Sequence, residues 1–168
     1  MKKPQTLYFK DDGSIPNSTL PALLYRDVVD KEGEGLASAL ETLFEHNGWP
    51  TQWRGGVFDF HHYHSTAHEV LGIYQGVATL RLGGEAGENI EVRAGDVIVL
   101  PAGTGHCRIS ASNDFALTAG YPPDQQDWDI CRSDDDIEAA RARIAQVTHP
   151  ARDPVTGDLS GVATDWTS

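Results

Sequence analysis

The chain has 168 residues, a length typical of one domain that buries roughly 70% of the surface its unfolded chain exposes. Its formal net charge of -12 argues against nucleic acid and anionic membranes as partners, because both attract clustered Lys and Arg. No apolar stretch has the length that a membrane span needs, and only two cysteines occur, Cys107 and Cys131. We therefore expect a cytoplasmic protein without disulfide bonds.

Residues 1–52 are expected to form an N-terminal arm of strands and one helix. Apolar runs at residues 6–9 and 22–29 predict two strands that extend a sheet edge, and Asn17 lies in the turn between them, in a solvated loop. Apolar residues then recur at helical spacing from Leu36 to Phe44 and stop before Gly48, which predicts a short amphipathic helix capped by glycine.

Residues 53–122 are expected to form the core of the domain. Segments rich in Val, Ile and Phe alternate with turns at residues 83–84, 87–88, 94–95 and 112–113, which predicts six or so closely spaced strands in a small barrel or sandwich. Glycines at 72, 76, 83, 84 and 95 allow tight turns and narrow barrel ends.

A candidate metal site lies in this core: His62, His64, Glu69 and His106. His62 and His64 are two residues apart and point to one face of a strand, whereas Asp59, His61 and Tyr63 point outward. Three neutral imidazoles and one carboxylate suit divalent Fe, Mn, Ni or Zn and leave coordination positions open. A single histidine of this kind would be better explained as a buried or surface side chain, but four such residues together favour a metal.

The spacing of these residues resembles the two motifs of the cupin family. Gly56, His62, His64, Glu69 and Gly76 follow the pattern G-x5-H-x-H-x4-E-x6-G, and Gly95, Pro101, Gly103 and His106 follow G-x5-P-x-G-x2-H. Ser110 stands where the pattern has Asn, a difference that concerns local packing rather than the metal. The longer sequence around both motifs is similar to the small YjlB-like cupins, a resemblance that implies no established activity.

The resemblance implies an all-β fold, the double-stranded β-helix or jelly-roll barrel, in one domain over residues 1–168. It also implies that His62, His64, Glu69 and His106 hold one divalent metal ion.

The neighbouring residue His68 is an alternative to Glu69. Strict strand alternation would place His68 on the face of His62 and His64, but a turn through residues 65–67 would break that alternation. The four-residue spacing favours Glu69 as the ligand and leaves His68 as a neighbouring imidazole, near the substrate or at the surface.

Arg108 is a candidate substrate-binding residue. It lies two residues beyond His106, so in a continuing strand it shares the metal-facing side and could grip a carboxylate. Pairing with an acidic residue at the barrel mouth is an equally good explanation.

Two functions fit this pattern. The first is an enzyme that acts on a small oxygenated or acidic molecule at the metal, with a dioxygenase as the leading subtype and an isomerase or decarboxylase using the same ligands. The second is a metal-dependent sensor or binding module without turnover. Fold alone does not separate them.

Residues 123–168 are expected to form a second helix and a tail. Asp134 or Asp135 can cap a helix with an apolar stripe from Ile137 to Val147, packed on the outside of the barrel. The tail after Pro150 is rich in Pro, Gly, Asp, Ser and Thr and is expected to be mobile. The early strands supply a sheet edge for a partner and the outward flank at 59–63 needs cover, so we expect a homodimer.

Overall fold

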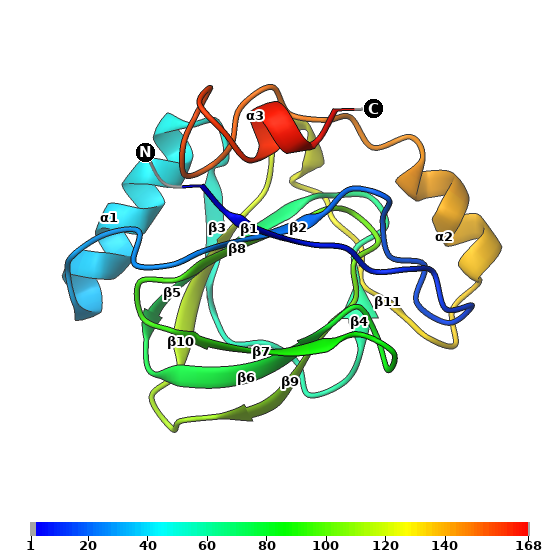
Figure 1. Ribbon diagram of the computed structural model, residues 1–168, viewed down its shortest axis with the longest axis horizontal. Coiled ribbons are helices and arrows are strands. Elements are labelled where there is room, and N and C mark those ends of the chain that lie inside the picture. The colour runs from blue at the N-terminus through cyan, green and yellow to red at the C-terminus, as the bar shows by residue number, and fades with distance from the viewer. Residues whose placement is uncertain (1–2, 168) are drawn as a thin grey trace.

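Two antiparallel sheets face each other as a barrel in the computed structural model, which describes residues 3–167 (Figure 1). The six-stranded sheet has the order β1 (Gln5–Leu7), β2 (Ala22–Tyr25), β8 (Val97–Leu100), β5 (Glu69–Gln75), β10 (Ala116–Gly120) and β3 (Thr51–Gly55). The five-stranded sheet has the order β11 (Cys131–Arg132), β4 (His62–Tyr63), β9 (His106–Ala111), β6 (Val77–Leu82) and β7 (Glu88–Arg93). The predicted all-β jelly-roll barrel is therefore confirmed.

The barrel interior is filled by alternate side chains from both sheets. In β6, Ala78, Leu80 and Leu82 are buried while the residues between them are more exposed, the period-two pattern of a strand with one apolar face. They pack with residues of the facing sheet such as Leu71 and Ile98. Burying these apolar faces against each other is the main force that closes the barrel.

Helix α1 (Gly33–His46) covers the outer face of the six-stranded sheet, against β5 and β10 (Figure 1). As predicted, it ends at Asn47, and Gly48 follows with a φ of +85°. Gly72 serves this contact and not a turn, because it lies in the middle of β5 and a Cβ there would approach the Phe44 ring to 2.9 Å. The helix can pack closely because β5 has no side chain at this point.

Helix α2 (Ile137–Ile144) covers part of the five-stranded sheet. Its N-cap is Asp136, whose side chain accepts a hydrogen bond from the Ala139 amide at 3.2 Å, so the predicted caps Asp134 and Asp135 were wrong. Ala140 packs with Tyr63, Ile15 and Cys131 in a small buried cluster. Tyr63 points away from the barrel interior, but the chain's own C-terminal segment covers it, so this position needs no partner.

The tail, which was expected to be mobile, packs instead against the outside of the six-stranded sheet. It contains α3 (Val162–Asp165), and both Val162 and Trp166 are buried with α1 residues in one apolar cluster. The fully buried Asp153 accepts hydrogen bonds from the Tyr25 hydroxyl and the Val162 amide, both at 2.9 Å. The polar composition of the tail suggested mobility, but these long-range contacts hold it in place.

Asn17 is not in a solvated loop, as its sequence context suggested, but is buried. Its side-chain amide donates to the carbonyls of Lys10, at 2.8 Å, and Gly83, at 3.1 Å, and its Oδ1 accepts from the Gly105 amide at 3.1 Å. Asn17 thereby ties the N-terminal arm to the loop that precedes His106.

Within residues 3–167, no helix combines the length and the apolar character that crossing a bilayer requires.

Candidate metal centre

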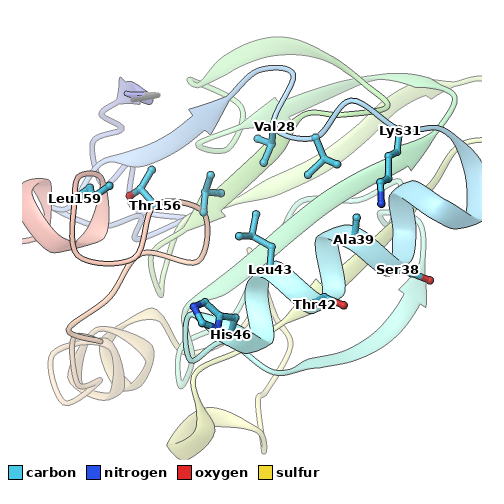
Figure 2. A pocket seen from close by; sticks show the side chains of 11 residues that line it. Val28, Lys31, Ser38, Ala39, Thr42, Leu43, His46, Thr156 and Leu159 are labelled. Atoms are coloured by element: carbon cyan, nitrogen blue, oxygen red, sulfur yellow. The ribbon is translucent and has the colours of Figure 1, made fainter.

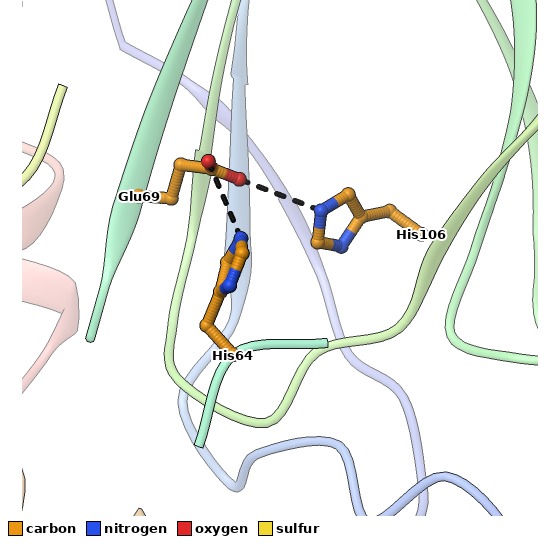
Figure 3. Close-up of side chains that lie close together, drawn as sticks. All are labelled: His64, Glu69 and His106. Carbon is orange, nitrogen blue, oxygen red and sulfur yellow. Dashed lines mark ion pairs between the residues drawn. The ribbon is translucent and has the colours of Figure 1, made fainter. Parts of the chain in front are cut away.

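Three of the predicted metal ligands come together between the two sheets (Figure 3). Glu69 is the first residue of β5 in the six-stranded sheet, whereas His106 begins β9 and His64 follows β4 in the five-stranded sheet. All three side chains are buried, and one ligand atom from each lies within 4.8 Å of the others. The barrel fold thus brings together two motifs although strands β6, β7 and β8 lie between Glu69 and His106 in the sequence.

The two imidazoles turn their Nε2 atoms toward the Glu69 carboxylate (Figure 3). His64 Nε2 is 3.3 Å from Oε2, and His106 Nε2 is 3.4 Å from Oε1. Oε1 is buried and has no hydrogen-bond partner of good geometry among the described residues. A buried carboxylate oxygen in this position requires a proton donor or a cation nearby.

The opposite ring nitrogens determine which tautomer each histidine prefers. His64 Nδ1 lies 2.5 Å from the Asp129 carbonyl, His106 Nδ1 lies 3.1 Å from the Thr104 carbonyl, and His62 Nδ1 lies 3.0 Å from the Phe60 carbonyl. Because a carbonyl only accepts, each Nδ1 must carry the proton, which leaves the Nε2 lone pair free in the neutral ring. Metal-binding histidines are held in this way, so the donor set fits a divalent transition metal.

The charges of the cluster point in the same direction. Burial alone would raise the pKa of Glu69, but the neighbouring His64 and His106 outweigh it and hold that pKa below its usual value. Burial lowers the pKa of His64, but the charge of Glu69 outweighs burial and raises that pKa. Without an ion, Glu69 therefore favours a proton on His64, and a bound cation would displace this proton. Glu69 is therefore ionised, and this negative charge favours a cation over an empty apolar pocket.

Two residues that the sequence did not single out hold the carboxylate. The Tyr121 hydroxyl donates to Glu69 Oε2 at 2.5 Å, and the Trp53 indole N–H donates to the Tyr121 oxygen at 2.8 Å. Burial and the charge of Glu69 raise the pKa of Tyr121, so it remains a donor. Neither residue belongs to the motif positions, and only the fold brings them to the site.

Asp129 is a third residue that the sequence did not indicate. Its carbonyl accepts from His64, while its carboxylate accepts hydrogen bonds from the amide and hydroxyl groups of both Ser65 and Thr66. The segment before β11 is thereby fastened to the turn between His64 and Glu69. Asp129 positions His64 without touching the carboxylate of Glu69.

The second motif is also fastened to the first. Gly103 has a φ of +97° and donates its amide to the His64 carbonyl at 2.8 Å, and a Cβ at this position would lie 2.4 Å from the Asn17 carbonyl oxygen. Only glycine fits such a turn.

His62, the fourth predicted ligand, lies beside the three-residue cluster and not within it. Its ring centroid is 4.1 Å from that of His106 and 6.2 Å from that of His64, and it lines the same cavity. Burial, and then the neighbouring His106, lower the pKa of His62 to about 3, so the ring is neutral and keeps its Nε2 lone pair.

His68 lies away from the cluster. Its Nδ1 accepts from the Ala102 amide at 2.8 Å, and its ring packs 4.7 Å from Trp166, a residue of the outer apolar cluster. Burial, followed by His149, lowers the pKa of His68 to about 3. The turn through residues 65–67 therefore breaks the strand alternation in favour of Glu69.

Arg108 faces Asp59, with 4.0 Å between the guanidinium and the carboxylate, and its Nη1 donates to the Val57 carbonyl at 3.4 Å. Arg108 pairs with the buried Leu80 across β9 and β6, so its Cβ lies on the inward face of the sheet, as predicted. Its side chain, however, is not among those that line the cavity. Its role in substrate binding stays a prediction.

A cavity of about 480 Å³ opens beside the cluster. It is lined by Gln52, Trp53, Gly56, Val57, Phe58, His62, His64, Glu69, Leu71, His106, Trp128 and Ile130.

A second hollow of about 880 Å³ lies outside the barrel, between α1 and the segments at 28–31 and 155–159 (Figure 2). Among the described residues, no motif residue lines this second hollow, so the chemistry of the motifs belongs to the first cavity.

Comparison with known proteins gives one family and one full-length relative. A family model described as "Cupin domain" matches residues 51–118. The uncharacterized protein YjlB of Bacillus subtilis (strain 168) is 38% identical over 167 residues, which cover 98% of both chains.

Solved structures resemble the chain only weakly. A recombinant pro-11S globulin of pumpkin has a TM-score of 0.38 at 22% identity over 47% of this chain, which spans only 22% of the globulin. RmlC from Streptococcus suis, solved in complex with dTDP-D-xylose, has a TM-score of 0.39 at 11% identity, covering 73% of this chain and 70% of RmlC. Likenesses of this size identify neither a substrate nor an activity.

Proposed function

Because the chain belongs to the cupin family, we propose that it binds one divalent transition metal ion and acts on a small oxygenated molecule beside it. The ligands we propose are His62, His64, Glu69 and His106. The observation that carries the proposal is the pair of Nε2 atoms turned toward a buried, ionised carboxylate while each Nδ1 is held by a backbone carbonyl. A divalent cation on these atoms would satisfy both lone pairs and the carboxylate charge.

When bound, such a metal supplies a Lewis acid or a redox centre with positions open for substrate or O₂. The chain's own residues would orient the reactants. Tyr121 fixes the Glu69 carboxylate by donating to Oε2, and Asp129 and Thr104 fix the two imidazole rings. Most of the cavity walls are apolar, so electrostatic interactions beside them are stronger than in bulk water. Dioxygenase chemistry is our leading subtype, with isomerase or decarboxylase chemistry as the alternatives.

Elemental analysis of protein purified without a histidine tag tests this proposal. We expect one transition metal ion per chain in the wild type and a loss of most of it in His64→Ala, with His46→Ala as a control on the exposed end of α1. Iron or manganese would favour oxygen chemistry, and zinc would weaken that subtype. Stoichiometric metal in His64→Ala would show that the assigned site is wrong.

Removal of the ion should also lower the melting temperature. A ligand present at about 1,000 times its dissociation constant stabilises the folded state by roughly 4 kcal/mol, or roughly 8–16 °C for a chain of this size. A chelator should therefore shift the wild type and leave His64→Ala unchanged. Equal melting temperatures of the wild type with and without chelator would speak against a tightly held ion.

A further inference from the structure

The polar side chains that line the cavity beside the cluster are those of Gln52, His62, His64, Glu69 and His106. Its other walls are the apolar side chains of Trp53, Val57, Phe58, Leu71, Trp128 and Ile130. Among residues 3–167, neither a lysine nor an arginine lines the cavity. An anion with two charges would therefore find no fixed positive side chain here, and Glu69 adds a negative one.

The polar atoms of these walls are already used within the protein. The Trp53 indole N–H donates to the Tyr121 hydroxyl, and the Trp128 indole N–H donates to Gln52 Oε1, both at 2.8 Å. The amide nitrogen of Gln52 donates in turn to the Gln126 carbonyl at 2.9 Å. The side chains of both tryptophans and of Gln52 therefore make their hydrogen bonds within the protein. The indole rings present mainly apolar surface to a ligand.

Two large apolar side chains remain exposed at this cavity. Phe58 is 48% exposed and Ile130 is 43% exposed, and they come from segments that are far apart in the sequence. Phe58 is held in place, stacked on Phe60 with 4.8 Å between ring centroids. Exposed apolar surface that meets at a concave site is typical of a place where an apolar ligand binds.

Trp128 forms a rigid wall close to the cluster. Its ring stacks on Tyr121 with 5.3 Å between centroids and an interplanar angle of 22°, and it meets the edge of His64 at 5.1 Å. A ring beside Trp128 would therefore lie within reach of the His64 side of the cluster.

From these contacts we propose that the ligand has an apolar body about the size of an aromatic ring and one compact oxygen-bearing head group. The head group binds at the His/Glu cluster, and the body lies between Trp128, Phe58 and Ile130. This inference rests on the proposed metal site. It differs from binding of a small dianion through Arg108, whose guanidinium faces Asp59 and lies outside the cavity lining.

Two hydroxamic acids with one head group and different bodies test the inference. Protein loaded with zinc is first checked for one ion per chain and is then titrated calorimetrically with benzohydroxamic acid and with acetohydroxamic acid. We expect benzohydroxamic acid to bind at least about tenfold more tightly, because only its ring buries apolar surface against the walls. Equal affinities, or no binding of either compound to zinc-loaded protein, would overturn the inference.

Matched variants locate the body of the ligand. Ile130→Ala should lower the ratio of the two affinities severalfold. Ile109→Ala removes another exposed isoleucine, in β9 and outside the cavity, and should leave the ratio unchanged. Arg108→Met should also leave the ratio unchanged. Malonate that binds more tightly than benzohydroxamic acid, and loses this affinity in Arg108→Met, would contradict the inference.

The same experiment keeps the two proposals apart. If the chain does not retain zinc, the proposed metal site fails before any hydroxamate is added. If it retains zinc and does not discriminate between the two bodies, only the inference about the ligand fails.

Discussion

Glu69 and His68 are neighbours in the chain, yet they lie on opposite sides of the six-stranded sheet. Glu69 enters the barrel to meet His64 and His106, whereas His68 packs outside against Trp166. The motif spacing predicted this assignment, while strand alternation alone would have reversed it.

Substitution of these two neighbours tests the assignment. Glu69→Gln should lower metal affinity by far more than the roughly 10–100-fold that accompanies loss of a group behind the ligands, and His68→Ala should stay within that range. Competition with a chromophoric chelator measures both. A larger loss in His68→Ala would indicate a four-histidine site in which Glu69 takes no part.

Asp129 provides the second test at the residue scale. Its carboxylate holds the turn at Ser65 and Thr66, and this contact places the carbonyl that binds His64. Asp129→Ala should lower metal affinity roughly 10–100-fold without removing a ligand. The exposed Asp127 of the same segment gives a matched control, because Asp127→Ala should leave metal affinity unchanged. Equal effects of the two substitutions would remove Asp129 from the site.

At the scale of elements, α1 shows how sequence periodicity and packing contribute separately. The spacing of its leucines and Phe44 predicted the helix, and Asn47 with Gly48 marked its end. The sequence did not show that the helix packs across the middle of β5, because that contact depends on Gly72, which lacks a side chain.

Two glycine substitutions separate these contributions. Gly72→Ala should lower the free energy of unfolding by roughly 1–3 kcal/mol, because its Cβ would press on the Phe44 ring. Gly35→Ala lies within α1 with no atom near its Cβ, and it should raise that free energy by up to about 1 kcal/mol. Urea denaturation monitored by circular dichroism measures both. Stabilisation by Gly72→Ala would mean that α1 does not approach β5 this closely.

At the scale of the whole molecule, a homodimer remains our prediction, and it now depends on the sheet edge. β1 is the outermost strand of the six-stranded sheet, so its outer side could pair with a second copy. The outward flank at residues 59–63 needs less cover from a partner than the sequence suggested, because Ala140 and Cys131 of the same chain cover Tyr63.

Light scattering measures the assembly directly. We expect a mass of twice 18.3 kDa at micromolar concentration, because an open strand edge favours pairing with a second strand. A mass of 18.3 kDa under these conditions would show that β1 leaves its edge unpaired.

The sequence by itself determined an all-β core and the candidate ligands. Local spacing predicted a barrel or sandwich, and the resemblance of the motifs to those of cupins implied the jelly-roll barrel. Alternation of apolar residues places one face of each strand inward, and the positions of the histidines and Glu69 relative to glycine turns are fixed along the chain. Tertiary structure alone decided which groups hold those ligands, because Tyr121 and Asp129 lie outside the motif positions and reach the site only through the fold. It also decided that the tail packs against the outside of the six-stranded sheet. It also decided that Arg108 turns to Asp59 and leaves the cavity walls apolar. Such contacts form when the two sheets close on each other, so the periodicity of a single segment cannot predict them.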